Sequence, residues 1–155
     1  MDARMKVDVP GCTLSARLDG PKDKPWMVLS NSLGADLSMW DPQMPALTAR
    51  HRVLRYDGRG HGESALSTSP IRMDTLVADV IALLDRLGIE RVEFLGLSLG
   101  GMTGLGLALN HPQRLTRLIC CAARADAPPD YVHTWDERIA AIKSDRKSTR
   151  LNSSH

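Results

Sequence analysis

The sequence is poor in aromatic residues and cysteine, and it has no long apolar run. Aromatic side chains make up 4% of the 155 residues, and there are three cysteines. A small, odd number of cysteines argues against a disulfide-stabilised secreted domain, so we expect three reduced, structural thiols and a cytoplasmic protein. No segment approaches the roughly 20 apolar residues of a membrane span, and residues 1–9 lack the apolar core of a signal peptide. The sequence therefore predicts neither a membrane anchor nor a leader.

The chain also lacks an excess of charge. The net charge is +2, with lysine and arginine scattered along the sequence, which argues against binding to nucleic acid or to an anionic membrane. Hydrophobic residues make up 43% and charged residues 25%, as is typical of one globular domain. Small neutral or acidic molecules remain as expected ligands, and the oligomeric state is left open.

Hydrophobic periodicity predicts an alternating order of strands and helices. Residues 5–9 and 13–18 alternate around Pro10 and Gly11, which predicts a β-hairpin. Further strands are expected at residues 26–30, 52–56, 91–95 and 115–122, and helices at residues 42–50, 74–87 and 99–110. Asp41 is the expected N-cap of the first helix, before Pro42. This order predicts an α/β fold with a mostly parallel sheet and helices on both faces.

The texture changes after residue 124. Residues 126–130 are rich in proline, and residues 131–143 have the pattern of an amphipathic helix. We therefore expect a core at residues 1–124 and the start of a cap at residues 125–144. Residues 145–155 read DRKSTRLNSSH, contain one large apolar residue and resemble a translated sequencing adapter, which predicts a non-native tail.

The strongest chemical signal is a Gly-x-Ser-x-Gly motif. Gly96, Ser98 and Gly100 lie between an apolar strand and a helix, the context in which a strained turn projects a nucleophilic serine. The helix that follows directs its N-terminal amides at developing negative charge. The alternative is a tight glycine-rich connection without chemistry. We interpret Ser98 as the nucleophile.

A second loop follows the strand at residues 26–30 and reads Asn31-Ser32-Leu33-Gly34. Acyl transfer needs two donors that converge on one oxygen, and the backbone N–H groups of Leu33 and Leu99 are the expected oxyanion-hole donors. The alternative is that Asn31 and Gly34 only shape a turn.

A third segment, residues 56–64, is rich in titratable side chains and glycine. We interpret Asp57, Arg59 and His61 as structural, since paired with one another or with backbone they would hold a constrained turn near the nucleophile. The alternative is that the segment contributes directly to catalysis.

The chain resembles the α/β-hydrolases, and within them the 3-oxoadipate enol-lactonases, in the stretches NSLGADLSMWDPQMPAL, YDGRGHGES, FLGLSLGGMTGLGLA and CCAARAD. The resemblance implies the N-terminal part of a mostly parallel sheet of about eight strands, of which this chain would supply about six. It further implies a Ser-Asp-His triad whose acid and base follow the seventh and eighth strands, beyond this sequence. No metal or cofactor is implied.

The implied substrate is a carboxylated enol-lactone, a small anionic molecule. Arg124 is the expected cation for its carboxylate, and Trp135 is the expected wall on the cap side. Without the acid and base we expect this chain to be inactive. Three alternatives remain open, namely another carboxylesterase, a cofactor-free perhydrolase of the same fold and a hydrolase-fold protein that only binds.

Overall fold

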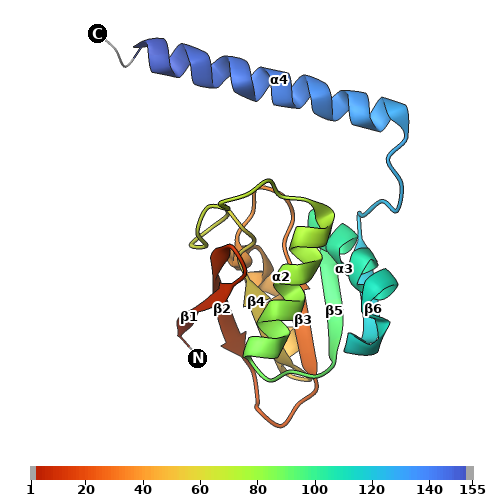
Figure 1. The fold of residues 1–155 in the computed structure, drawn as a ribbon. Coiled ribbons are helices and arrows are strands. Elements are labelled where there is room, and N and C mark those ends of the chain that lie inside the picture. The colour runs from red at the N-terminus through yellow and green to blue at the C-terminus, as the bar shows by residue number, and fades with distance from the viewer. Residues whose placement is uncertain (1–2, 153–155) are drawn as a thin grey trace. The chain divides into compact units, whose positions relative to one another are not determined.

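The computed structural model describes residues 3–152, in two compact units that divide between Arg124 and Ala125. The first unit contains one sheet with the strand order β1-β2-β4-β3-β5-β6 (Figure 1). Its strands are β1 (Arg4–Val9), β2 (Cys12–Asp19), β3 (Trp26–Ser30), β4 (Arg52–Tyr56), β5 (Val92–Leu97) and β6 (Leu115–Cys121). The predicted strands are all confirmed, and no end differs by more than two residues.

The pairing directions also follow the sequence. Val9 lies opposite Cys12 across the Pro10–Gly11 turn, where Gly11 adopts a φ of +75°, and β2 runs antiparallel to both β1 and β4. Strands β4, β3, β5 and β6 are parallel to one another. The carboxyl ends of these four strands therefore meet at one edge of the sheet, where ligands bind in open α/β folds.

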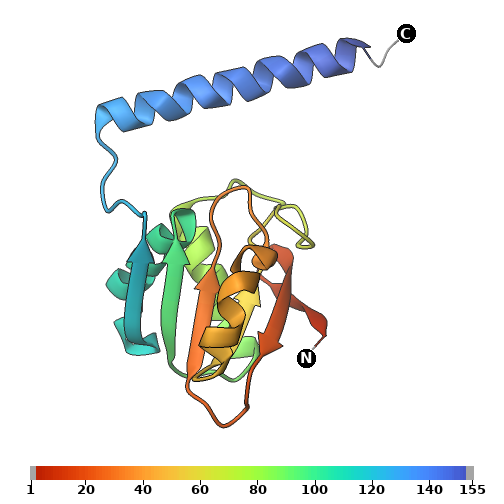
Figure 2. The same ribbon diagram turned by 180° about the vertical axis from the view of Figure 1, so that it is seen from behind.

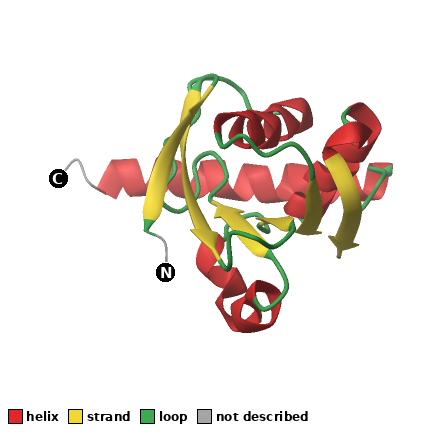
Figure 3. Ribbon diagram, turned by 90° about the horizontal axis from the view of Figure 1, so that it is seen from below, coloured by secondary structure: helices red, strands yellow, loops and turns green. Residues whose placement is uncertain are grey.

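Helices cover both faces of this sheet. Helices α2 (Met73–Arg86) and α3 (Leu99–Asn110) pack on one face, and the 3-10 helix η1 (Leu37–Gln43) with α1 (Met44–Thr48) packs on the other (Figures 2 and 3). A short 3-10 helix, η2 (Pro112–Arg114), leads into β6. The larger core, under α2 and α3, includes Val28, Leu54 and Phe94, all fully buried. The smaller core, under α1, includes Leu29 and Val53.

The first predicted helix is the one that the structure corrects. Residues 37–48 form a 3-10 helix followed by a short α-helix, and Pro42 lies inside the 3-10 segment. Asp36, rather than Asp41, is the N-cap, because its side chain accepts a hydrogen bond from the Ser38 N–H. Asp41 instead pairs with Arg55 at 2.6 Å, a contact that joins distant segments and that local capping rules do not anticipate.

The second unit contains helix α4 (Pro129–Asn152), which includes the helix predicted at residues 131–143. The helix runs through residue 145 without a break, whereas residues 153–155 lie outside the described residues. The non-native origin of residues 145–155 stays a prediction. No helix in the described part of the chain is long and apolar enough to cross a bilayer.

Candidate active site

Ser98 occupies the turn from β5 to α3 with φ 54° and ψ −113°. A non-glycine residue with positive φ is strained, and such strain concentrates at functional sites. The turn is held because the Ser98 N–H donates to the Cys121 carbonyl of β6 at 2.8 Å. The half-buried serine therefore has the backbone geometry that its motif predicted.

Three glycines make room for this turn. A Cβ on Gly96 would lie 2.2 Å from the Gly100 carbonyl oxygen, and a Cβ on Gly100 would lie 2.1 Å from the Ser30 oxygen. A Cβ on Gly101 would lie 2.6 Å from the Cβ of Ala123. Any side chain at these positions would push α3 away from the sheet and move Ser98.

The N-terminus of α3 presents unpaired amides beside Ser98. The first intrahelical bond runs from the Met102 N–H to the Ser98 carbonyl at 3.0 Å, so the Leu99 N–H has no acceptor within the helix. No other hydrogen bond of this amide is found among residues 3–152. It is available to an anionic oxygen at the positive end of the helix dipole.

The loop after β3 is fixed at its base by side-chain contacts. Asn31 accepts a hydrogen bond from Trp40 Nε1 at 2.8 Å and donates to the Tyr56 carbonyl at 2.9 Å. A turn follows in which the Ala35 N–H donates to the Ser32 carbonyl. Leu33 lies at its tip, 51% exposed, and within the described chain its amide makes no hydrogen bond.

Leu33 and Leu99 line one cavity of about 320 Å³. The structure therefore brings together the two residues expected to supply the oxyanion donors. Most of the remaining wall is apolar, from Ile71, Met73 and Leu76, and the cavity is also lined by Arg59, His61 and Arg72. This arrangement suits a small substrate with an apolar body and a polar or anionic end.

The segment after β4 is a hub of structural hydrogen bonds. Asp57 is fully buried and accepts from the Leu37 and Glu63 amides at 2.7 and 2.9 Å, besides its 2.9 Å ion pair with Arg4. His61 Nε2 lies 2.9 Å from the Gly34 amide, and its Nδ1 lies 2.9 Å from the Arg59 carbonyl oxygen. These contacts support the structural interpretation, although Asp57, Arg59 and His61 pair mainly with other partners.

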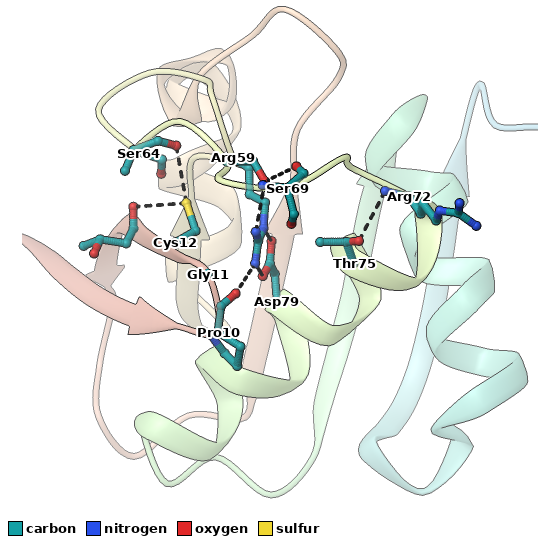
Figure 4. A network of polar contacts seen from close by, with 12 residues as sticks. Pro10, Gly11, Cys12, Arg59, Ser64, Ser69, Arg72, Thr75 and Asp79 are labelled. Carbon is teal, nitrogen blue, oxygen red and sulfur yellow. Dashed lines mark hydrogen bonds and ion pairs between the residues drawn. The ribbon is translucent and has the colours of Figure 1, made fainter.

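Arg59 forms a buried ion pair with Asp79 of α2, which the sequence analysis missed. Its Nε and Nη2 lie 2.7 and 2.8 Å from the two carboxylate oxygens, and the guanidinium also reaches the Pro10 carbonyl (Figure 4). The hydrogen bond to Asp79 raises the pKa of Arg59. The sequence offered one signal for this pair, namely that Asp79 falls on the apolar face predicted for this helix, where an aspartate needs a partner.

A second buried polar pair lies behind the loop after β3. Ser30 Oγ and the Tyr56 hydroxyl are 2.8 Å apart. Burial raises the pKa of Tyr56 and outweighs the lowering effect of the bond to Ser30. The phenol therefore stays neutral and acts as a hydrogen-bonding partner of Ser30 at the end of β3.

The two expected substrate-binding residues lie apart in the chain. Arg124 is exposed in the segment after β6. Trp135 lies on α4 in the second unit, with its ring 6.2 Å from that of Tyr131 and the Arg138 guanidinium 4.8 Å above it. The cavity is lined instead by Arg59, which pairs with Asp79, and by Arg72, which the sequence analysis missed. No acidic side chain within residues 3–152 forms an ion pair with Arg72.

No cluster of three or more potential metal ligands is found in the described part of the chain. The candidate site thus combines a strained serine with the Leu33 and Leu99 amides. Both leucines line the cavity with arginine at its wall, whereas Ser98, next to Leu99 in the chain, is not itself among the lining residues.

Comparison with known proteins agrees with this architecture. Residues 25–153 match the model of the alpha/beta hydrolase fold family. The chain is 40% identical over 124 residues to 3-oxoadipate enol-lactonase 2 of Acinetobacter baylyi, covering 80% of this chain and 46% of that protein. It is also 40% identical over 125 residues to RutD of Caulobacter sp., a proposed carbamate hydrolase, covering 79% and 47%.

A solved structure shows the same fold. A hydrolase from Pseudomonas aeruginosa superposes with a TM-score of 0.85 at 45% identity, over 96% of this chain and 58% of that chain. The chain spans about half the length of the curated relatives that it matches.

Proposed function

Since the chain belongs to the α/β-hydrolase fold family, we propose that it supplies the nucleophile and oxyanion hole of a serine hydrolase that opens a carboxylic ester or enol-lactone. The observation that carries the proposal is the strained turn at Ser98, where the central serine of a Gly-x-Ser-x-Gly motif has a positive φ between a strand and a helix. A protein that merely binds would not need this strain, which disfavours the non-catalytic alternative.

In the proposed reaction the Ser98 hydroxyl oxygen attacks the carbonyl carbon while a histidine takes its proton. The Leu33 and Leu99 amides stabilise the oxyanion of the tetrahedral intermediate. Collapse of this intermediate breaks the ester bond and protonates the leaving oxygen, and water then releases the acyl group from Ser98. No step needs a metal or a cofactor.

We propose that the histidine of this reaction lies in the intact protein beyond residue 144, where the expected non-native tail begins in this chain. His61 lines the cavity, but both of its ring nitrogens are occupied by backbone groups. His51 is engaged with Glu93 at 3.2 Å and with the Leu47 carbonyl. We therefore expect the 155-residue chain alone to show no turnover that depends on Ser98.

We further propose a substrate that carries a carboxylate. Arg59 lines the cavity but is neutralised by Asp79, whereas Arg72 is exposed at the cavity wall. Arg72 thus joins Arg124 as a candidate partner for the carboxylate, with Trp135 as a candidate cap-side wall. The name of the Acinetobacter relative favours 3-oxoadipate enol-lactone, and that of the Caulobacter relative favours a carbamate.

The test is steady-state turnover by the full-length gene product that contains this sequence. Enol-lactone, a neutral 4-nitrophenyl ester and a small carbamate are compared for the parent and for Ser98→Ala. We expect the enol-lactone to be preferred and the variant to lose about 10⁴-fold or more in kcat. Parent-like turnover by the variant would overturn the nucleophile, and a preference for another substrate would overturn only the lactone.

The role of Arg72 is tested by Arg72→Gln beside the matched control Arg86→Gln, at an exposed arginine near the other end of α2. A hydrogen bond to a charged group contributes about 1.5–3 kcal/mol, which corresponds to roughly 10- to 100-fold. We expect kcat/KM to fall by that factor for the anionic lactone only, and only in Arg72→Gln. An equal fall for the neutral ester would refute charge recognition.

A further inference from the structure

The turn that carries Leu33 accepts support from another segment, because its Gly34 N–H is hydrogen-bonded to a histidine of the segment after β4. We propose that His61 is a positioning residue that fixes the Ser32–Ala35 turn in the conformation that presents the Leu33 amide to the reacting carbonyl. The Gly34 N–H donates to His61 Nε2 at 2.9 Å. The catalytic part of this inference rests on the proposed function, whereas the positioning part does not.

The hydrogen-bond partners of His61 determine its tautomer. Nδ1 lies 2.9 Å from the Arg59 carbonyl oxygen, which only accepts hydrogen bonds. Nδ1 therefore carries the hydrogen, and Nε2 keeps the lone pair that accepts the Gly34 N–H. The neutral ring is thus the form that fits both partners.

The turn has two possible arrangements of its central peptide. The Ala35 N–H donates to the Ser32 carbonyl, and Gly34 adopts a φ of +77°, as residue i+2 of a type II turn does. A type I turn joins the same ends with the peptide between Leu33 and Gly34 reversed. In that arrangement the Gly34 N–H would point away from His61 and the Leu33 carbonyl would face the Nε2 lone pair instead, so this hydrogen bond selects the observed orientation of the Leu33–Gly34 peptide. The Leu33 N–H belongs to the preceding peptide, so His61 acts on it by fixing the backbone on the far side of Leu33.

His61 is itself anchored to α2 through Arg59. The Arg59 and Asp79 side chains are 3% and 4% exposed, and their two-pronged contact fixes the residue whose carbonyl holds the imidazole. The far end of the same loop is held by Asp57, which accepts the Leu37 N–H at 2.7 Å. The loop that presents Leu33 is therefore aligned by the segment after β4.

Little of the overall stability depends on this contact. Gly34 is exposed and His61 is half-buried, so the hydrogen bond between them exchanges with water at little cost to the folded state. Aligning an oxyanion donor affects rate far more, since removal of one donor costs about 10²–10³ in kcat. The two roles therefore predict different measurements.

The test compares His61→Gln with His61→Leu in the full-length gene product. Gln can place Oε1 near the position of Nε2 and accept the Gly34 N–H, whereas Leu cannot. We expect Leu to lower kcat by about 10- to 100-fold with KM within about twofold, and Gln to stay within about threefold of the parent. Amide exchange at Gly34 should quicken in Leu and stay slow in Gln, with thermal midpoints alike.

Equal kcat losses in both variants, or an unchanged kcat in Leu, would overturn the catalytic role. Unchanged Gly34 exchange in Leu would overturn the positioning role. The Ser98→Ala comparison keeps the proposals separate, because parent-like turnover there refutes the nucleophile while the exchange measurement still decides what His61 does.

Discussion

Strands β4 and β6 have similarly apolar centres, yet one is buried along its whole length and the other is largely exposed. In β4 all five residues are buried, and Val53 and Leu54 have no exposed surface. In β6 Ile119 is 38% exposed, and the neighbouring Cys120 and Cys121 are exposed. The difference shows that an apolar run predicts a strand, whereas burial depends on what lies beside and above it.

Strand β4 lies between β2 and β3 and is covered on both faces, by α2 and by α1. Among the strands of residues 3–152, β6 pairs only with β5. One face of β6 packs under α3, where Leu118 approaches Gly104, and Ile119 lies on the opposite face. The loops of the candidate site follow β3, β4 and β5, in the better-covered part of the sheet, and β6 contributes the Cys121 carbonyl that accepts from the Ser98 N–H.

The largest expected effect of this contrast is on association. Residues 1–144, expressed alone, present β6 as an apolar edge strand, and such edges recruit other chains. We expect aggregates in light scattering and no sharp thermal transition. Ile119→Lys places a charge on the edge and should reduce the aggregate size. A soluble monomer that unfolds cooperatively would show that the open edge is harmless.

Most of the fold could be predicted because its signals are local. Apolar runs predicted the strands, and helical periodicity over residues 74–87 predicted α2, which ends shortly before Gly88 at φ +67°. The Gly-x-Ser-x-Gly motif located the strained turn because only glycine fits the close approaches around it.

The rest depends on partners that are distant in sequence. Asp41 precedes Pro42 and therefore predicts a helix cap, but in the structure it pairs with Arg55 of β4, 14 residues further along the chain. Arg59 and Asp79 meet only because β4 and α2 pack together, and Arg72 joins the cavity for the same reason. Tertiary packing decides such contacts, and local pattern does not encode them.

A second, smaller effect is expected from two ion pairs of α2. One joins α2 to the loop after β4, and the other joins it to the segment before β6. Asp79 pairs with buried Arg59 beside the loop after β4, whereas Asp85 is 60% exposed and pairs with Arg114 of η2, just before β6. Breaking a buried pair leaves an uncompensated charge and costs about 3–5 kcal/mol, whereas exposed pairs contribute about 0–1 kcal/mol.

We therefore expect Asp79→Ala to lower the free energy of unfolding of the full-length protein by several times more than Asp85→Ala. Urea titration measures both variants under identical conditions. Equal losses would mean that the β6 side is as tightly coupled to the fold as the β4 side, against the contrast drawn from burial.

The smallest expected effect lies in the cap of η1, at the end of the loop that carries Leu33. Asp36 accepts hydrogen bonds from the hydroxyl and the amide of Ser38, and these lower the pKa of Asp36, the hydroxyl most strongly. A carboxylate whose pKa is lowered by folding stabilises the protein above its unfolded pKa, and this stabilisation is lost as the pH falls through the folded value.

Ser38→Ala removes the hydroxyl, so the pKa of Asp36 should rise toward its ordinary value while remaining below it, because the backbone bond stays. Titration of the Asp36 carboxyl by NMR measures this shift. The stability difference between parent and variant should be present at neutral pH and shrink in acid, and it should be small because Asp36 is well solvated. An Asp36 pKa that does not move in Ser38→Ala would show that the hydroxyl leaves the cap unaffected.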